Sequence, residues 1–241
     1  DLARIPLQIR KQSNSVYWIL EQQGSEKTAK YIKDHMPYAP IFFGHNFPLG
    51  KHLDNPAYWE LLDFSIKKVS TLGNIIELGV GKGGITNIFA DHFSDRTIHG
   101  FDIFETEEVF ENTTYVKGPP GIIPNVRKNV VLHKGWFKDT LPEFMKTNKE
   151  DISFLHWDTN IYASSKTGFD VLGPKIKSGT IILINSYFDY PLWWMHVYKA
   201  FAEFVKDNNV SYEYLGYKEG RSVVGGSDNG SVCIRISSIK H

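Results

Sequence analysis

A glycine-rich turn followed by an acid is the stretch of this sequence best suited to chemistry. Residues 77–84 read ELGVGKGG, and Asp102 follows at the distance expected of an acid that binds a ribose. Glycine accepts positive φ and lets the backbone approach a ligand that a Cβ would obstruct. The free N–H groups at the start of the following helix favour a carboxylate or a phosphate. We therefore expect a nucleotide-like cofactor at this turn.

Two cofactors fit the turn equally well. Gly79, Gly81 and Gly84 match the dinucleotide fingerprint, in which Asp102 would bind the ribose. Glu77 followed by Gly79, Gly81 and Gly83 also matches the loop that class I methyltransferases wrap around S-adenosylmethionine, where Asp102 would accept both ribose hydroxyls. The turn alone does not decide between the two.

The elements that position this turn follow an alternating pattern. Strand and helix signals alternate from residue 74 onward, which favours an α/β fold with a mainly parallel, doubly wound sheet and helices on both faces. The expected strands cover 74–79, 97–102, 129–133, 152–157 and 180–184. The expected helices cover 83–93, a stretch through Leu141 and Met145, 163–173, and an amphipathic stretch from Trp194 to Val205.

A closing hairpin separates the two cofactor hypotheses. Residues 211–217 and 231–236 are expected to form two strands joined by a glycine-rich loop over 219–230. Dinucleotide dehydrogenases normally continue with another parallel strand and a separate substrate domain, for which no chain remains. Class I methyltransferases, with their Rossmann-like sheet, end in a C-terminal antiparallel hairpin at the sheet edge. This arrangement favours S-adenosylmethionine.

The residues before the turn are expected to be extra N-terminal helices. Asn55 followed by Pro56 is a helix start signal, with a capping side chain before a proline at the first helical position. We divide the chain into a helical cap or substrate-lid segment over 1–70 and a cofactor-binding core over 71–241, together one domain. The aromatic-rich N-terminal segment also suits a homodimer contact. Because the chain begins at Asp1 rather than methionine, we expect it to be trimmed or part of a longer protein.

Three further stretches resemble a known family. Residues 100–105 read GFDIFE, residues 135–142 read GWFKDTLP, and residues 156–165 read HWDTNIYASS. Together with the glycine turn they resemble the macrocin O-methyltransferase family, whose members include sugar O-methyltransferases of macrolide biosynthesis. The resemblance covers residues 74–236, and GWFKDTLP is its most specific part.

The resemblance implies a class I fold, S-adenosylmethionine as methyl donor, and methylation of a hydroxyl group assisted by a divalent metal such as Mg²⁺. It also implies which residues bind the cofactor. By position these are Glu77, Gly79, Gly81 and Gly83 for the methionine end, Asp102 for the ribose, and Gly135, Trp136 and Phe137 for the adenine.

The sequence departs from the family at the metal-binding acids. Members usually carry Asp-x-Asp-x-Tyr where this chain has Asp158, Asn160 and Tyr162, and two acids where it has Asn185 and Ser186. Magnesium prefers hard oxygen ligands, typically with one or two carboxylates. The remaining candidate ligands are the carboxylate of Asp158 and the neutral carbonyl of Asn185, so the attraction for a cation is weakened. If no metal binds there, either methyl transfer proceeds by a base and positioning alone, or the chain is a non-catalytic relative that keeps the cofactor fold.

Asp158 and His156 are the catalytic candidates. Ligands bind at the C-terminal ends of the strands in such sheets, and Asp158 follows the fourth strand beside the cofactor. It would act there as a base or a metal ligand, because methyl transfer needs an aligned nucleophile and a group that takes its proton. His156 shares the face of Asp158 if the strand is regular, and a hydrogen-bonded strand histidine is the alternative.

The composition disfavours several other functions. Lysine plus arginine and aspartate plus glutamate number 27 each, so no overall charge attracts nucleic acid or an anionic membrane. No apolar run approaches the roughly 18 residues of a membrane span. The single cysteine fits a reducing compartment, and we expect the cytoplasm. The expected partner is a small-molecule hydroxyl acceptor, a sugar or other natural product, and an NAD-dependent oxidoreductase is the third hypothesis.

Overall fold

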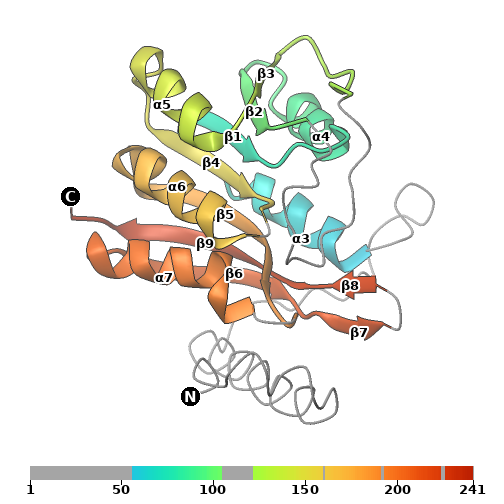
Figure 1. Ribbon diagram of the computed structural model, residues 1–241, viewed down its shortest axis with the longest axis vertical. Helices are drawn as coiled ribbons and strands as arrows, with labels where there is room; N and C mark the ends of the chain where they lie inside the picture. The colour runs from blue at the N-terminus through green and yellow to red at the C-terminus, as the bar shows by residue number, and fades with distance from the viewer. Residues whose placement is uncertain (1–55, 105–121, 160, 191–192, 224–225, 241) are drawn as a thin grey trace.

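The computed structural model describes residues 56–104, 122–159, 161–190, 193–223 and 226–240, without the side chains of 221–228. Figure 1 shows these residues as a twisted sheet with helices on both faces. The expected lid and dimer-contact segment before residue 56, and Asn160, lie outside the described residues.

Seven strands form the main sheet in the order β3-β2-β1-β4-β5-β9-β6. The first five are parallel, whereas β9 pairs antiparallel with both β5 and β6. The chain therefore reverses its direction of strand addition between β1 and β4, which is where ligands bind in open α/β sheets. The strand bounds are β1 Asn74–Leu78, β2 Ile98–Asp102, β3 Val130–Lys134, β4 Ile152–Trp157, β5 Ile176–Phe188, β6 Ser211–Lys218 and β9 Gly230–Ser238.

Helices cover both faces of this sheet (Figure 1). One face carries α5 (Phe137–Thr147), α6 (Tyr162–Leu172) and α7 (Val197–Asp207), and the other carries α3 (Pro56–Lys67) and α4 (Gly84–His92). Each face has its own buried cluster of apolar side chains. The first includes Phe144, Phe169 and Phe201 from the three helices, and the second includes Leu61, Phe89 and Phe154.

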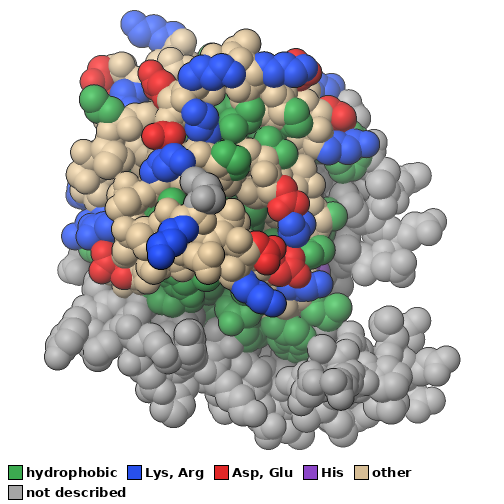
Figure 2. Space-filling view, turned by 90° about the vertical axis from the view of Figure 1, so that its left-hand side faces the viewer, with side chains coloured by type: hydrophobic (Ala, Val, Ile, Leu, Met, Phe, Trp, Pro, Cys, Tyr) green, Lys and Arg blue, Asp and Glu red, His purple; other side chains and the backbone are tan. Residues whose placement is uncertain are grey.

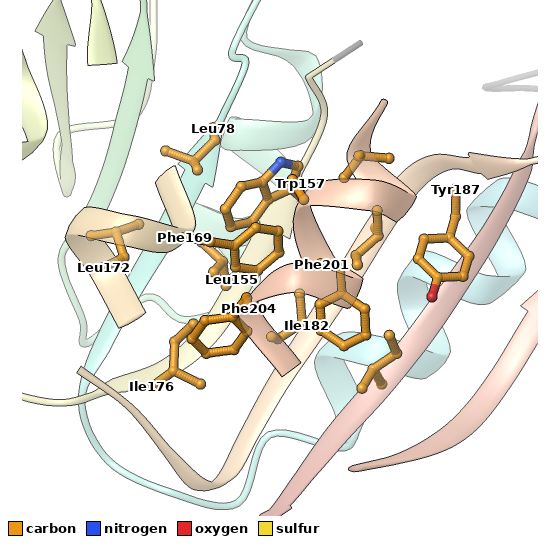
Figure 3. Close-up of a cluster of buried hydrophobic side chains, with 14 of the residues drawn as sticks. Leu78, Leu155, Trp157, Phe169, Leu172, Ile176, Ile182, Tyr187, Phe201 and Phe204 are labelled. Atoms are coloured by element: carbon orange, nitrogen blue, oxygen red, sulfur yellow. The ribbon is translucent and has the colours of Figure 1, made fainter. Parts of the chain in front are cut away.

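Stacked aromatic rings hold α6 and α7 against β4 (Figure 3). The rings of Trp157 and Phe169 are 3.8 Å apart between centroids and tilted by 12°, and Phe169 is 5.1 Å from Phe204. Gly168 allows this approach, because a Cβ there would lie 2.7 Å from the indole of Trp157. The end of β4, where Asp158 follows, is thus fixed by dense packing.

The observed elements confirm the expected fold class of a mainly parallel sheet with a C-terminal antiparallel hairpin. The strand expected over 180–184 is longer and runs from Ile176 to Phe188. The loop expected over 219–230 contains two short paired strands, β7 (Arg221–Val223) and β8 (Gly226–Asp228). The last expected helix begins later, at Val197, after a 3-10 turn over Trp193–Met195.

The described part of the N-terminal segment belongs to the core of the sheet. Tyr58, Leu61, Leu62 and Ile66 of α3 are buried in the same cluster as β1 and β4 residues. The division of the chain at residue 70 stays a prediction, but α3 covers the sheet rather than standing apart from it.

The surface of the described residues mixes both signs of charge. On the face shown in Figure 2, basic and acidic side chains are interspersed among polar and apolar ones. No helix in the described ranges is both long and apolar enough to cross a bilayer.

Candidate active site

The glycine turn leaves the end of β1 in contact with the end of β4. Gly79 has a φ of +94°, and a Cβ built on it would lie 2.2 Å from the carbonyl oxygen of Asp158. The backbone N–H of Asp158 donates to the carbonyl of Leu78 at 2.9 Å. Gly79 is therefore required for the close approach of two strand ends, which places Asp158 beside the turn.

Gly81 provides the open part of the turn. It has a φ of +54°, and a Cβ there would meet no atom within 4 Å. Its N–H donates to Oδ2 of Asp102 at 2.8 Å, while Oδ1 accepts from the N–H of Phe104 at 2.9 Å. Each carboxylate oxygen has a second lone pair, so Asp102 can accept further hydrogen bonds from hydroxyl groups. The unobstructed position at Gly81 and the acid beside it are compatible with the predicted cofactor site, and the binding of ribose and methionine there stays a prediction.

The expected adenine-binding residues begin next to Asp102. The N–H of Gly135 donates to the carbonyl of Asp102 at 3.0 Å, which joins the ends of β2 and β3. The side chain of Trp136 is 37% exposed, whereas Phe137 is partly buried against the core of the α5 face. Of the two aromatic side chains, Trp136 is the one free to stack on a ligand.

Glu77 lies beneath the turn rather than in its open part. Its carboxylate is buried, with Oε1 3.0 Å from Nδ1 of His156 and Oε2 accepting from the hydroxyl of Thr86. Burial raises the pKa of Glu77, and the hydrogen bonds from His156 and Thr86 oppose that shift. The contact of Glu77 with the methionine end stays a prediction, since both oxygens already have partners in the chain.

His156 is a buried residue of β4 with both ring nitrogens engaged. Its Nε2 lies 2.6 Å from the hydroxyl of Tyr58, opposite the contact with Glu77. Its ring also packs against Phe89 of α4, with centroids 5.3 Å apart. Burial and the charges of Asp158 and Glu77 raise the pKa of Tyr58 well above its usual value. This geometry favours a positioning role for His156, and its catalytic role stays a prediction.

Asp158 and Asn185 meet where β4 and β5 end. Oδ1 of Asp158 accepts a hydrogen bond from the amide nitrogen of Asn185 at 2.9 Å. The carbonyl oxygen of Asn185 accepts from the N–H of Ser186 at 3.0 Å and from the hydroxyl of Ser231 at 2.8 Å. These two donors fix the orientation of the amide, so its nitrogen and not its oxygen faces Asp158.

This donor set does not fit magnesium. A magnesium ion takes oxygen ligands, usually with one or two carboxylates, whereas the group facing Asp158 is an N–H₂. Within the described ranges, no three acidic, histidine or cysteine side chains are grouped so that they could hold a metal. The assignment of Asp158 and Asn185 as metal ligands therefore has no support from their geometry.

Sequence reasoning missed three residues that shape this region. The helical spacing of apolar residues predicts only that Tyr58 packs in the core, yet its hydroxyl contacts His156. Thr86 and Ser231 likewise gave no signal, since a helical threonine and a strand serine are ordinary surface residues. A hydroxyl at an otherwise buried position is the only sequence clue that such residues offer.

The middle of the chain is similar to a known family. Residues 76–187 match a family model described as "Methyltransferase domain". This segment is a methyltransferase domain. The match and the inserted strand β9 together favour a methyltransferase over the NAD-dependent alternative. A comparison with curated proteins finds no match.

Solved structures share the fold of this methyltransferase. The calicheamicin methyltransferase CalS11 is 19% identical, with a TM-score of 0.55 over 87% of this chain and 91% of its own. The O-methyltransferase NovP is 17% identical, with a TM-score of 0.55 over 90% of this chain and 99% of its own. At these identities the similarity shows the class I fold alone, and that fold implies S-adenosylmethionine as the methyl donor. The narrower macrocin family stays a prediction.

Proposed function

We propose that this methyltransferase transfers the methyl group of S-adenosylmethionine to a hydroxyl group of a small molecule, a sugar or another natural product. The observation that carries the proposal is the junction of strand ends at which Gly79 touches Asp158 and Gly81 binds Asp102. This junction places the proposed cofactor-binding turn next to the carboxylate oxygen of Asp158 that Asn185 does not bind. The printed names of two structures of similar fold support the acceptor class, since NovP is an O-methyltransferase and CalS11 a TDP-rhamnose 3′-O-methyltransferase.

Each group at this junction has a task in the proposed reaction. S-adenosylmethionine supplies a methyl group on a sulfonium, which needs no further activation by the protein. Asp102 would accept the ribose hydroxyls, and Trp136 would stack on the adenine. The N–H groups at the start of α4 would face the carboxylate of the methionine portion. The backbone therefore holds the donor, and the side chains fix its orientation.

Asp158 is the group proposed to take the proton of the acceptor hydroxyl. One of its oxygens is held by the amide of Asn185, which leaves the other free to accept. Because Asn185 is itself locked by Ser186 and Ser231, the carboxylate of Asp158 is held in one orientation. An oriented base within hydrogen-bond reach of the acceptor contributes typically about 10²–10⁴-fold to a rate.

The test has a binding arm and a transfer arm. Calorimetric titration with S-adenosylhomocysteine should show saturable binding that Asp102→Asn weakens. Methyl transfer should then be measured with labelled S-adenosylmethionine and TDP-rhamnose, in the presence of a chelator. Absence of S-adenosylhomocysteine binding to the folded protein would refute the cofactor assignment.

A non-catalytic relative is the second candidate. The observation that favours it is that an amide, rather than a second acid, faces Asp158. It predicts S-adenosylhomocysteine binding without methyl transfer to any hydroxyl acceptor. Transfer that is lost in Asp158→Asn would eliminate it.

We also infer a cytoplasmic location, supported by Cys233, a buried free thiol.

A further inference from the structure

Four buried side chains form a continuous hydrogen-bonded chain through the centre of the molecule. The hydroxyl of Tyr58 contacts Nε2 of His156 at 2.6 Å, and Nδ1 of His156 contacts Glu77 at 3.0 Å. The hydroxyl of Thr86 donates to the other oxygen of Glu77. The chain thus connects α3 with β4, β1 and α4, and all four side chains are buried.

With Glu77 ionised and His156 neutral, every contact of this chain has one donor and one acceptor. An ionised Glu77 accepts from Thr86 and from Nδ1–H of His156, which leaves Nε2 of a neutral imidazole to accept from Tyr58. No described side chain besides Tyr58 makes a hydrogen bond to Nε2. Removing the Tyr58 hydroxyl would therefore leave a buried nitrogen without a partner and loosen the ring that supports Glu77.

The far end of the chain is the cofactor turn. Thr86 lies in the first turn of α4, which begins at Gly84 directly after the glycine run. Two hydrogen bonds thus hold the turn. The carboxylate of Asp102 accepts from the N–H of Gly81, and the buried carboxylate of Glu77 accepts from the hydroxyl of Thr86. Asp102 is predicted to bind the ribose and Glu77 the methionine end, so both hydrogen bonds involve residues of the predicted cofactor site.

We propose that Tyr58 is a positioning residue for the cofactor, acting through His156 and Glu77 on the turn over residues 79–84. The proposal rests on the proposed function, since it concerns binding of S-adenosylmethionine. It extends the site to a residue of α3, which lies outside the matched methyltransferase domain of 76–187. The segment before that domain then supports the donor site as well as any acceptor site.

The physical reason is preorganisation of the turn. The cofactor binds backbone N–H groups whose positions depend on the turn being held before binding. If the buried support loosens, the turn must become ordered when the cofactor binds. The free energy of that ordering opposes binding, so the affinity falls although no direct contact is lost. A change of this kind raises the KM for S-adenosylmethionine and leaves kcat nearly unchanged.

The first experiment compares two tyrosine variants by calorimetric titration with S-adenosylhomocysteine. Tyr58→Phe should weaken binding about fivefold, at the lower end of typical couplings between sites. Tyr214→Phe is the matched control, because it also removes a buried tyrosyl hydroxyl, 2.9 Å from that of Tyr187 on β5, between residues outside the chain from Tyr58 to Thr86. The control should lower the melting temperature and leave the affinity at the wild-type value.

The second experiment tests transmission along the chain. Thr86→Val removes the hydroxyl at the opposite end with little change of shape and should also weaken S-adenosylhomocysteine binding. Tyr58 and Thr86 act through the same two residues, so the double variant should bind no more than about twofold more weakly than the worse single variant. Thr86→Val also keeps the proposal testable if Tyr58→Phe does not fold.

The outcomes separate this proposal from the function on which it rests. If the wild type does not bind S-adenosylhomocysteine, the proposed function fails. If the wild type binds and Tyr58→Phe or Thr86→Val binds equally tightly, the positioning role is overturned. The positioning role would also be overturned if the fold-losses of affinity of the two single variants multiplied in the double variant. Such independence would mean that Tyr58 and Thr86 do not act through one connected chain.

Discussion

Replacing Gly79 with alanine would place a methyl group where the end of β4 already lies. The added Cβ would stand 2.2 Å from the carbonyl oxygen of Asp158 and 3.0 Å from its carbonyl carbon. Both atoms belong to the backbone, so no side chain can rotate away and the ends of β1 and β4 must separate. Residues held in sparsely populated backbone regions cost about 1–3 kcal/mol by themselves, and alanine at a φ of +94° is such a case. With the clash added, we expect the free energy of unfolding to fall by more than about 3 kcal/mol.

Urea denaturation of Gly79→Ala and Gly84→Ala measures this loss against a matched control. Gly84 lies at the start of α4, and a Cβ there would meet nothing within 4 Å. Alanine is the better helix former, so Gly84→Ala should keep the wild-type stability or gain up to about 1 kcal/mol. If Gly79→Ala were as stable as Gly84→Ala, the claim that the turn is set by contact with β4 would be refuted.

Three further predictions concern the site and the sheet. Asp158→Asn should lower kcat at least about 100-fold, and a wild-type rate would show that another group takes the proton. Trp136→Ala should weaken S-adenosylhomocysteine binding about tenfold with little change in melting temperature, because stacking on a base is worth about 1–3 kcal/mol; an unchanged affinity would exclude stacking. Burial and the neighbouring His133 lower the pKa of His99 from 6.5 to about 4, so the folded protein binds this proton less readily than the unfolded chain. The contribution of His99 to stability should then be complete well above pH 6.5 and fall by up to about 2 kcal/mol as the pH drops from 7 to 5, a slope that urea titrations of His99→Gln should show reduced.

The alternation of strands and helices was predictable because each element carries its own periodicity. β1, β2 and β4 begin and end within one residue of the expected positions. The extent of β5 was not predictable, since Asn185 and Ser186 are polar residues typical of a strand end. Ser231 of the neighbouring strand β9 donates a hydrogen bond to Asn185, and Ser186 is buried with a φ of 54° at a register shift between β5 and β9. Such a contact depends on a residue far along the chain.

The candidate site was predictable in its types of residue but not in their directions. Asp102 and Gly81 meet as the spacing predicts. Glu77, two residues before Gly79, turns its carboxylate into the core, because His156 and Thr86 offer partners there. Tyr58, which follows His156 in that hydrogen-bonded chain, comes from a helix 98 residues away from His156 in sequence. Local sequence patterns carry no information about a hydrogen bond between residues so far apart in the chain.

The insertion of β9 between β5 and β6 has a consequence for synthesis and folding. Of the strands in the described sheet, β9 is synthesised last. Until residues 230–238 have been synthesised, β5 and β6 therefore each have an edge without its final hydrogen-bonding partner. Long-range pairing of this kind slows folding, and an exposed apolar edge can meanwhile pair with another chain. A nascent chain stalled before β9 would therefore be a substrate for chaperones, whereas β1 to β4 could already be assembled.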